Sequence, residues 1–157
     1  MQKTFAHLAL FLTACAFTPR PEGLHEARFE GHAVQSVREA ARVVVAEFAH
    51  PMSEVRITNE GSVLTEGWAG ACGPEVACTT SVGYPDNAPT PWTTIAVRFH
   101  DLGTATAAEV VIAFEDCEPD VDCEPQLLGS TGNLERRILD GIRARLESPE
   151  ENPLAEL

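Results

Sequence analysis

Apolar residues recur every three or four positions over residues 32–48, which is the spacing of one face of an α-helix. The recurring residues are Val34, Val37, Ala41, Val44, Val45 and Phe48. Charged residues fall mainly between them, so we predict an amphipathic helix that buries one stripe in the core. A seam with a partner helix is the alternative, although the stripe is short for a coiled coil. Pro51 ends the helix, because a residue before proline is disfavoured in the helical region.

The same spacing returns near the end of the chain, over residues 134–146. Its apolar row is Leu134, Ile138, Ile142 and Leu146, and the arginines predicted to face outward are Arg136, Arg137, Arg143 and Arg145. Asn133 is predicted to cap this second helix, because its side chain can accept a hydrogen bond from a free backbone N–H of the first turn.

The middle of the chain shows the patterns of β-strands. Ile95, Val97 and Phe99 alternate toward one face, whereas residues 108–114 are more uniformly apolar. A uniformly apolar run of this length is typical of a central strand that is covered on both sides. We interpret Trp68 and Trp92 as aromatic residues of the core or of the sheet edge.

Two short patterns each occur twice in this region. The segment 55–57, Val-Arg-Ile followed by Gly61, is echoed by the segment 97–99, Val-Arg-Phe followed by Gly103. Further along, the pattern C-x-P-[DE]-V-x-C occurs at residues 72–78 and again at residues 117–123. We interpret the two copies as a twice-used unit of strand, turn, strand and closed loop.

These elements predict an α+β fold. It consists of an N-terminal helix, five or six mostly antiparallel strands in two meanders, and a C-terminal helix, with both helices on one face of the sheet. A single domain is expected over residues 31–148. Residues 15–30 are predicted to be a flexible tether, because prolines and a glycine stand among polar residues there. Residues 149–157 are predicted to be a disordered acidic tail.

The first fifteen residues have the parts of an export signal. Lys3 provides a positive start, residues 5–12 are mostly apolar, and small residues precede Cys15. The apolar run is too short to cross a bilayer, for which about 20 residues are needed. The segment Leu12-Thr13-Ala14-Cys15 resembles the lipobox of bacterial lipoproteins.

That resemblance implies a membrane anchor. In this family residues 1–14 would be removed as a signal peptide, Cys15 would carry diacylglycerol, and its new amino group would be acylated with a fatty acid such as palmitate. Two or three acyl chains hold a protein on a bilayer firmly, whereas one holds it weakly. Ala16 rather than Asp follows the cysteine, which implies the outer membrane, with the domain facing the periplasm. An ordinary secretory signal and an uncleaved anchor are the alternatives.

The chain is strongly acidic. Its formal net charge is −13, and Lys3 is the only lysine, so loss of residues 1–14 leaves arginine as the only basic residue type and a charge of about −14. This balance argues against nucleic acid as a partner and against docking of the domain on an anionic leaflet. A solvated acidic surface is the simplest interpretation, and a basic partner or a cation is compatible with it.

Four cysteines follow Cys15, and an exported chain meets an oxidising compartment. We therefore expect two disulfides, Cys72 with Cys78 and Cys117 with Cys123, because a proline turn inside each loop brings its two ends together. Pairing between the two loops is the alternative. Zinc is disfavoured, since five residues separate the cysteines of each loop and structural zinc sites favour two to four.

The second cysteine loop is rich in carboxylates at alternate positions. Asp116, Glu118, Asp120 and Asp122 form a weak calcium candidate, since calcium prefers oxygen ligands. The register fails the helix-loop-helix calcium motif, because Val121 stands where that loop needs glycine. An exposed acidic hairpin tip is the default interpretation.

The sequence contains no G-x-S-x-G elbow, no phosphate-binding glycine loop and no H-E-x-x-H pair. We therefore expect a protein that is not an enzyme and needs no cofactor. The first hypothesis is an accessory or scaffold lipoprotein of the cell envelope that binds an envelope protein or an envelope polymer without chemistry. The alternative is an acidic inhibitor or ligand-capture lipoprotein, directed at a basic enzyme such as lysozyme or at calcium.

Overall fold

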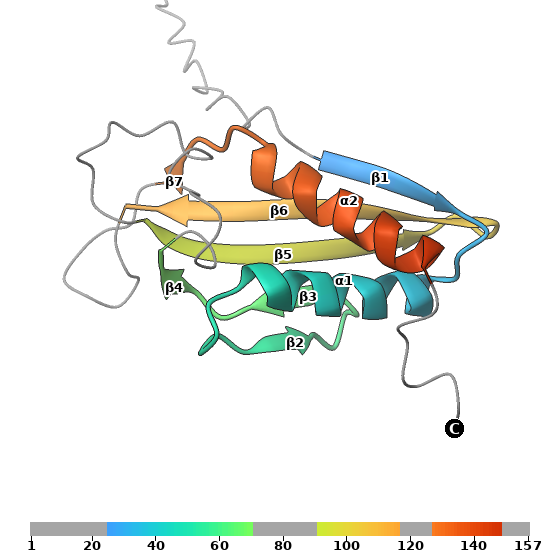
Figure 1. The fold of residues 1–157 in the computed structure, drawn as a ribbon, viewed down its shortest axis with the longest axis horizontal. Helices are drawn as coiled ribbons and strands as arrows, with labels where there is room; N and C mark the ends of the chain where they lie inside the picture. Colours follow the sequence, from blue (N-terminus) through green and yellow to red (C-terminus); the bar gives the residue numbers. More distant parts are fainter. Residues whose placement is uncertain (1–24, 71–90, 117–126, 149–157) are drawn as a thin grey trace, which may run out of the picture.

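The computed structural model describes residues 25–70, 91–116 and 127–148 (Figure 1). The described elements are β1 (His25–Glu30), α1 (Val34–Phe48), β2 (Val55–Ile57), β3 (Val63–Thr65), β4 (Trp68–Ala69), β5 (Trp92–Asp101), β6 (Ala105–Glu115), β7 (Leu127–Leu128) and α2 (Asn133–Glu147). All seven strands belong to one sheet, and the predicted α+β class is confirmed.

The sheet is built around the long hairpin of β5 and β6. The strand order is β1-β6-β5-β3-β2, and every pairing between described strands is antiparallel. The short strand β4 also pairs with β5, and the short strand β7 also pairs with β6. The uniformly apolar run of the sequence is therefore part of β6, an inner strand with partners on both edges.

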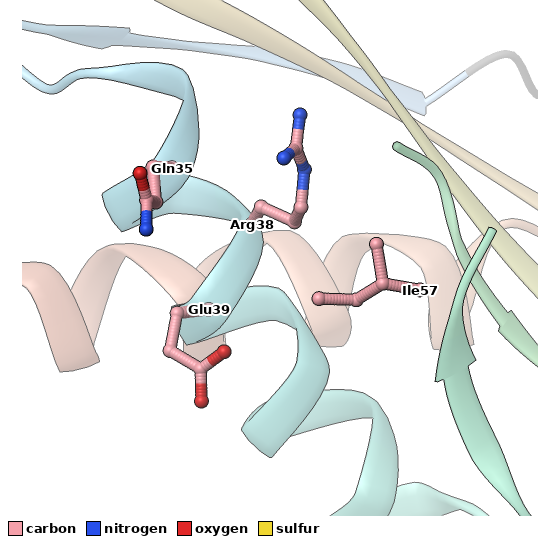
Figure 2. A pocket seen from close by; sticks show the side chains of 4 residues that line it. All are labelled: Gln35, Arg38, Glu39 and Ile57. Atoms are coloured by element: carbon pink, nitrogen blue, oxygen red, sulfur yellow. The ribbon is translucent and has the colours of Figure 1, made fainter. Parts of the chain in front are cut away.

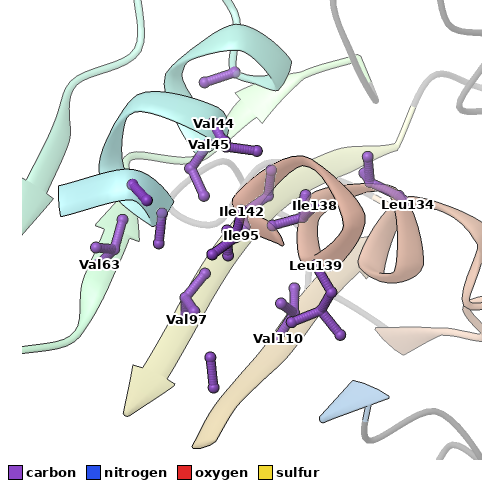
Figure 3. Packing of buried hydrophobic residues seen from close by; sticks show 14 of the residues in the cluster. Val44, Val45, Val63, Ile95, Val97, Val110, Leu134, Ile138, Leu139 and Ile142 are labelled. Carbon is purple, nitrogen blue, oxygen red and sulfur yellow. The ribbon is translucent and has the colours of Figure 1, made fainter. Parts of the chain in front are cut away.

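Strand register places one set of side chains under the helices. Val97 pairs with Val63 on one side and with Val110 on the other, so these three side chains share a face of the sheet. All three are fully buried, and they belong to the same hydrophobic cluster as Val45 of α1 and Ile142 of α2 (Figure 3). Figure 1 draws both helices in front of the same face of the sheet.

The two helices pack against each other as well as against the sheet. A Cβ atom at Gly141 of α2 would lie 2.9 Å from Cγ1 of Val44, so the missing side chain lets α2 approach α1 closely. The Arg137 guanidinium lies over the ring of Phe48, 5.2 Å from its centroid, and the Arg143 guanidinium lies 5.8 Å from the centroid of Phe29. Two arginines that we expected to face outward thus cover aromatic rings of neighbouring elements.

Residues 25–30 correct the predicted start of the domain. We expected them to be part of a tether, but they form β1, an edge strand that pairs with β6 and precedes α1 in the sequence. Ala27 and Phe29 point to the core, while Glu26, Arg28 and Glu30 occupy the alternate positions. The side chains of a strand alternate between its two faces, so every second residue of β1 is polar. These polar residues made the segment resemble a loop in composition.

The predicted cap of the second helix is also wrong. Gly132, with φ at 77°, occupies the N-cap position of α2, and Asn133 is the first helical residue. The Asn133 side chain accepts a hydrogen bond from Arg136 instead of capping a backbone N–H. Glycine fits this position because the backbone enters the helix through the left-handed region.

The two copies of the repeated strand pattern share a conformation. Gly61 closes the β2–β3 hairpin with φ at 82°, and Gly103 closes the β5–β6 hairpin with φ at 83°. The return strands differ in register, since Ile57 pairs with Val63, two residues after Gly61, whereas its counterpart Phe99 pairs with Ala108, five residues after Gly103. The resemblance therefore covers the incoming strand and its glycine, and ends at the turn.

Neither of the two described helices is both long enough and apolar enough to cross a membrane.

Candidate functional site

Most of the residues that the sequence singled out lie outside the described part of the chain. They are Cys15, Cys72, Cys78, Cys117 and Cys123, together with Glu118, Asp120 and Asp122. Asp116 is described and directly follows β6. Across the described ranges, no three His, Cys, Asp or Glu side chains gather closely enough to hold a metal ion.

The structure does fix the points where the two cysteine segments join the sheet. The N–H of Gly70 donates a 2.9 Å hydrogen bond to the carbonyl of Pro91, which brings together the residues that flank segment 71–90. Trp92 pairs with Ala69 on one side and with Glu115 on the other, and Glu115 in turn pairs with Leu127. Both segments therefore begin and end at the same end of the sheet, on adjacent strands.

A pocket of about 440 Å³ lies between α1 and the edge strand β2. It is lined by Gln35, Arg38 and Glu39 of α1 and by Ile57 of β2 (Figure 2). This volume falls within the range of small-molecule sites. The pocket combines one apolar wall with three polar side chains, and we regard it as the candidate binding site.

Arg38 is the unusual member of this pocket. Its Nε atom is buried and has no hydrogen-bond partner in the described part of the chain. Its guanidinium carbon lies 5.9 Å from the centroid of the Phe99 ring. A buried charged donor without an acceptor is costly, and a cation–π contact offsets only part of that cost.

Gly61 makes room for the Arg38 guanidinium. A Cβ atom at this position would lie 2.8 Å from Nη2 of Arg38, so the β2–β3 turn and the guanidinium can lie against each other only because residue 61 has no side chain. In Figure 2 the Arg38 side chain extends toward the strands, while the Glu39 side chain points the other way. The helix and the turn thus hold the guanidinium at the edge of the pocket.

Glu39 is already engaged by another arginine. Nη2 of Arg42 lies 2.6 Å from Oε1 of Glu39, and Nε of Arg42 donates a second hydrogen bond to the same carboxylate. The hydrogen bond from Arg42 lowers the pKa of Glu39 below its ordinary value, against the opposing effect of partial burial. Glu39 and Arg42 largely cancel in charge, which leaves Arg38 as the net charge of the pocket.

A second polar cluster lies at the start of α2. Glu135 is only 2% exposed, and its Oε1 accepts a 2.6 Å hydrogen bond from the hydroxyl of Ser130. Its Oε2 is buried and has no hydrogen-bond partner among the described residues. We interpret the cluster as part of the helix start.

We did not predict a role for Arg38, although its position in the sequence carries a signal. Arg38 stands four residues after Val34 and three residues before Ala41, so it borders the apolar stripe of α1 instead of lying on the opposite face. A charged residue at such a border has its stem packed against the core and its head at the margin. The partners from β2 and from the Gly61 turn follow only from the tertiary structure.

No family model matches the sequence, and searches of curated proteins and of solved structures likewise gave no match. The function is therefore inferred from the residues themselves.

Proposed function

We propose that the protein is a lipid-anchored lipoprotein of the cell envelope whose domain binds a partner and carries out no chemistry. The anchor is Cys15, which is acylated after removal of residues 1–14. It holds the protein on the periplasmic side of the outer membrane. The segment Leu12-Thr13-Ala14-Cys15 is the observation that supports the anchor.

The pocket beside Arg38 supports the binding role. It presents an arginine that has no ion-pair partner in the described part of the chain, next to an apolar wall. Such a site has the means to hold a ligand, because an unpaired guanidinium gains hydrogen bonds when an acceptor arrives. Binding to an envelope partner is therefore the role that we assign to the domain.

Mass spectrometry of the protein from its native membrane tests the anchor. We expect a first residue at position 15 that carries a diacylglycerol and an amide-linked fatty acid. A Cys15→Ser variant, which cannot form the thioether, should leave the membrane fraction. An intact Met1 with an unmodified Cys15 thiol would refute the anchor.

Capture from detergent-solubilised envelope tests the binding role. The full chain should retain a stable envelope partner, and Arg38→Gln should retain less of it, whereas Arg56→Gln should retain as much as the wild type. Arg56 is a suitable control because it is exposed and lies on β2 directly next to Ile57. Recovery of no partner with the wild-type protein would count against the proposed role.

A further inference from the structure

We propose that the pocket between α1 and β2 binds a small organic carboxylate, with the Arg38 guanidinium as the group that holds the acid. This inference rests on the proposed binding role and names the chemistry of the ligand. It combines three features of the pocket, which are an unpaired cation, an adjacent amide and an apolar wall.

The charge of the pocket selects an anion. In the described part of the chain, no carboxylate lies within ion-pair distance of Arg38, although the protein carries an excess of acidic residues. The nearest acidic member of the pocket lining, Glu39, is held by Arg42 at 2.6 Å. An incoming anion therefore meets one uncompensated positive charge rather than a balanced surface.

The guanidinium is also positioned in advance. Phe99 lies beside it, and the Gly61 turn lies against Nη2. Its Nε is buried without a partner among the described residues, whereas the Arg38 side chain as a whole is only partly buried. A side chain that is held in place before the ligand arrives loses less conformational freedom on binding.

The shape of the lining favours a carboxylate with a short apolar tail. A guanidinium presents parallel N–H donors that match the two oxygens of a carboxylate. The Gln35 amide, in the preceding turn of α1, supplies a further donor, and Ile57, whose exposed fraction is 44%, provides an apolar surface on the opposite wall. Phosphate would use the charge but would leave the Ile57 wall without an apolar partner.

Titration with butyrate tests the inference. The full chain, purified in detergent and labelled with ¹⁵N, would be titrated with sodium butyrate at constant ionic strength while the Nε–Hε signal of Arg38 is followed by NMR. That signal is assigned by its loss in Arg38→Gln. We expect a saturable shift with a Kd of about 1 to 30 mM, which lies within the ligand-efficiency limit for so small a molecule.

Two further probes separate the charge from the tail. n-Butylamine has the same tail with the opposite charge, and inorganic phosphate has negative charge without a tail. We expect no saturable shift with the amine and binding at least about fivefold weaker with phosphate, a difference of about 1 kcal/mol for the lost apolar contact. Phosphate binding as tight as that of butyrate would overturn the carboxylate assignment, as would the absence of saturation by butyrate.

Ile57→Glu is the sharpest variant. It places a carboxylate in the pocket wall, where it can pair with Arg38, so butyrate binding should fall at least about tenfold by competition within the protein. Arg56→Glu, which adds the same group at the neighbouring exposed residue of β2, should bind like the wild type. The backbone amide spectrum verifies that each variant is folded, and the amide signals of the pocket residues report butyrate binding in Arg38→Gln, which has no Nε–Hε signal at residue 38. Undiminished butyrate binding by folded Ile57→Glu or Arg38→Gln would refute the site.

The outcomes for the two proposals are separable. Butyrate binding by a protein with an unmodified Cys15 would refute the anchor and leave the carboxylate site standing. An acylated Cys15 together with no butyrate binding would refute the carboxylate site and leave the anchor standing.

Discussion

The hydroxyl of Ser130 donates a 2.6 Å hydrogen bond to Oε1 of Glu135 and accepts a 3.0 Å hydrogen bond from the N–H of Gly132. One side chain thereby joins the turn before α2 to a buried carboxyl group in the first turn of the helix. A negative charge at this end of a helix is favoured by the free N–H groups and by the helix dipole. The pair therefore orders the start of α2.

We predict that Ser130→Ala lowers the free energy of unfolding by about 1 to 3 kcal/mol, because it removes the described partner of a buried carboxyl group. The double variant Ser130→Ala with Glu135→Met should lose less than this, since both polar partners are then gone. Urea denaturation measures both values. If the double variant loses as much stability as Ser130→Ala and Glu135→Met lose together when measured separately, the two side chains are not coupled.

The paired glycines of the repeated strands permit a matched comparison. Gly61→Ala and Gly103→Ala should each destabilise the protein by about 1 to 2 kcal/mol, because alanine disfavours the left-handed backbone. Gly61→Ala should cost about 0.5 to 1 kcal/mol more, since its methyl group displaces the Arg38 guanidinium from Phe99, whereas a Cβ at Gly103 meets nothing within 4 Å. Thermal or urea denaturation measures the difference.

Arg38→Gln provides the control for this comparison. In the Arg38→Gln variant, the additional loss of stability caused by Gly61→Ala should disappear, while the loss caused by Gly103→Ala should be unchanged. An equal cost for the two glycine variants in the wild-type background would show that Arg38 does not depend on the space at Gly61.

The Glu39–Arg42 pair predicts a small dependence of stability on acidity. The folded protein lowers the pKa of Glu39, so this contribution is present above the ordinary carboxyl pKa of 4.5 and is lost as the pH falls through the folded-state pKa. Both side chains are more than two-fifths exposed, so the contribution should stay below about 0.5 kcal/mol. Arg42→Gln should therefore cost this amount at about pH 7 and nothing at about pH 3.

Arg143 offers a control with the same spacing. It faces Asp140 on α2 at a longer distance, 3.4 Å, and the two side chains are more exposed, at 48% and 64%. Arg143→Gln should show a weaker change of stability with pH than Arg42→Gln, as measured by urea denaturation over the same pH series. A larger effect at Arg143 would contradict the importance that we give to the short contact at Glu39.

We predict that peptide mapping without reduction finds Cys72 joined to Cys78 and Cys117 joined to Cys123. Each closed loop is short, so reduction of each disulfide should lower stability by about 2 kcal/mol in the chain-entropy model. The two segments leave the sheet side by side around Trp92, which makes a bridge between them the informative alternative. Peptides that link residue 72 or 78 to residue 117 or 123 would contradict the predicted pairing.

The sequence predicted the parts of the fold that repeat over many residues. The stripe from Val34 to Phe48 gave the first helix to within two residues, because a single buried face fixes the period of a helix. The strands β5 and β6 were recognised for a similar reason, although both extend beyond their apolar centres to Asp101 and Ala105. Polar residues at the hairpin tip carry no strand signal, and pairing alone extends the sheet there.

The features that escaped prediction depend on neighbours that are distant in the sequence. β1 is a strand because β6 pairs with it, and its alternation covers only Ala27 and Phe29. The pocket needs Arg38, Ile57, Gly61 and Phe99 from four separate elements, none of which indicates the others in the sequence. The predicted lipid and disulfide cysteines lie outside the described residues, and their assignments stay predictions.

The strand that begins at His25 limits how far the proposed lipoprotein can stand from its membrane. Only residues 16–24 separate an acylated Cys15 from β1, and nine residues span at most about 30 Å when fully extended. That distance is about the thickness of the hydrocarbon core of a bilayer. The domain would therefore sample a shell close to the bilayer surface, and a partner would have to reside in, or reach into, that shell.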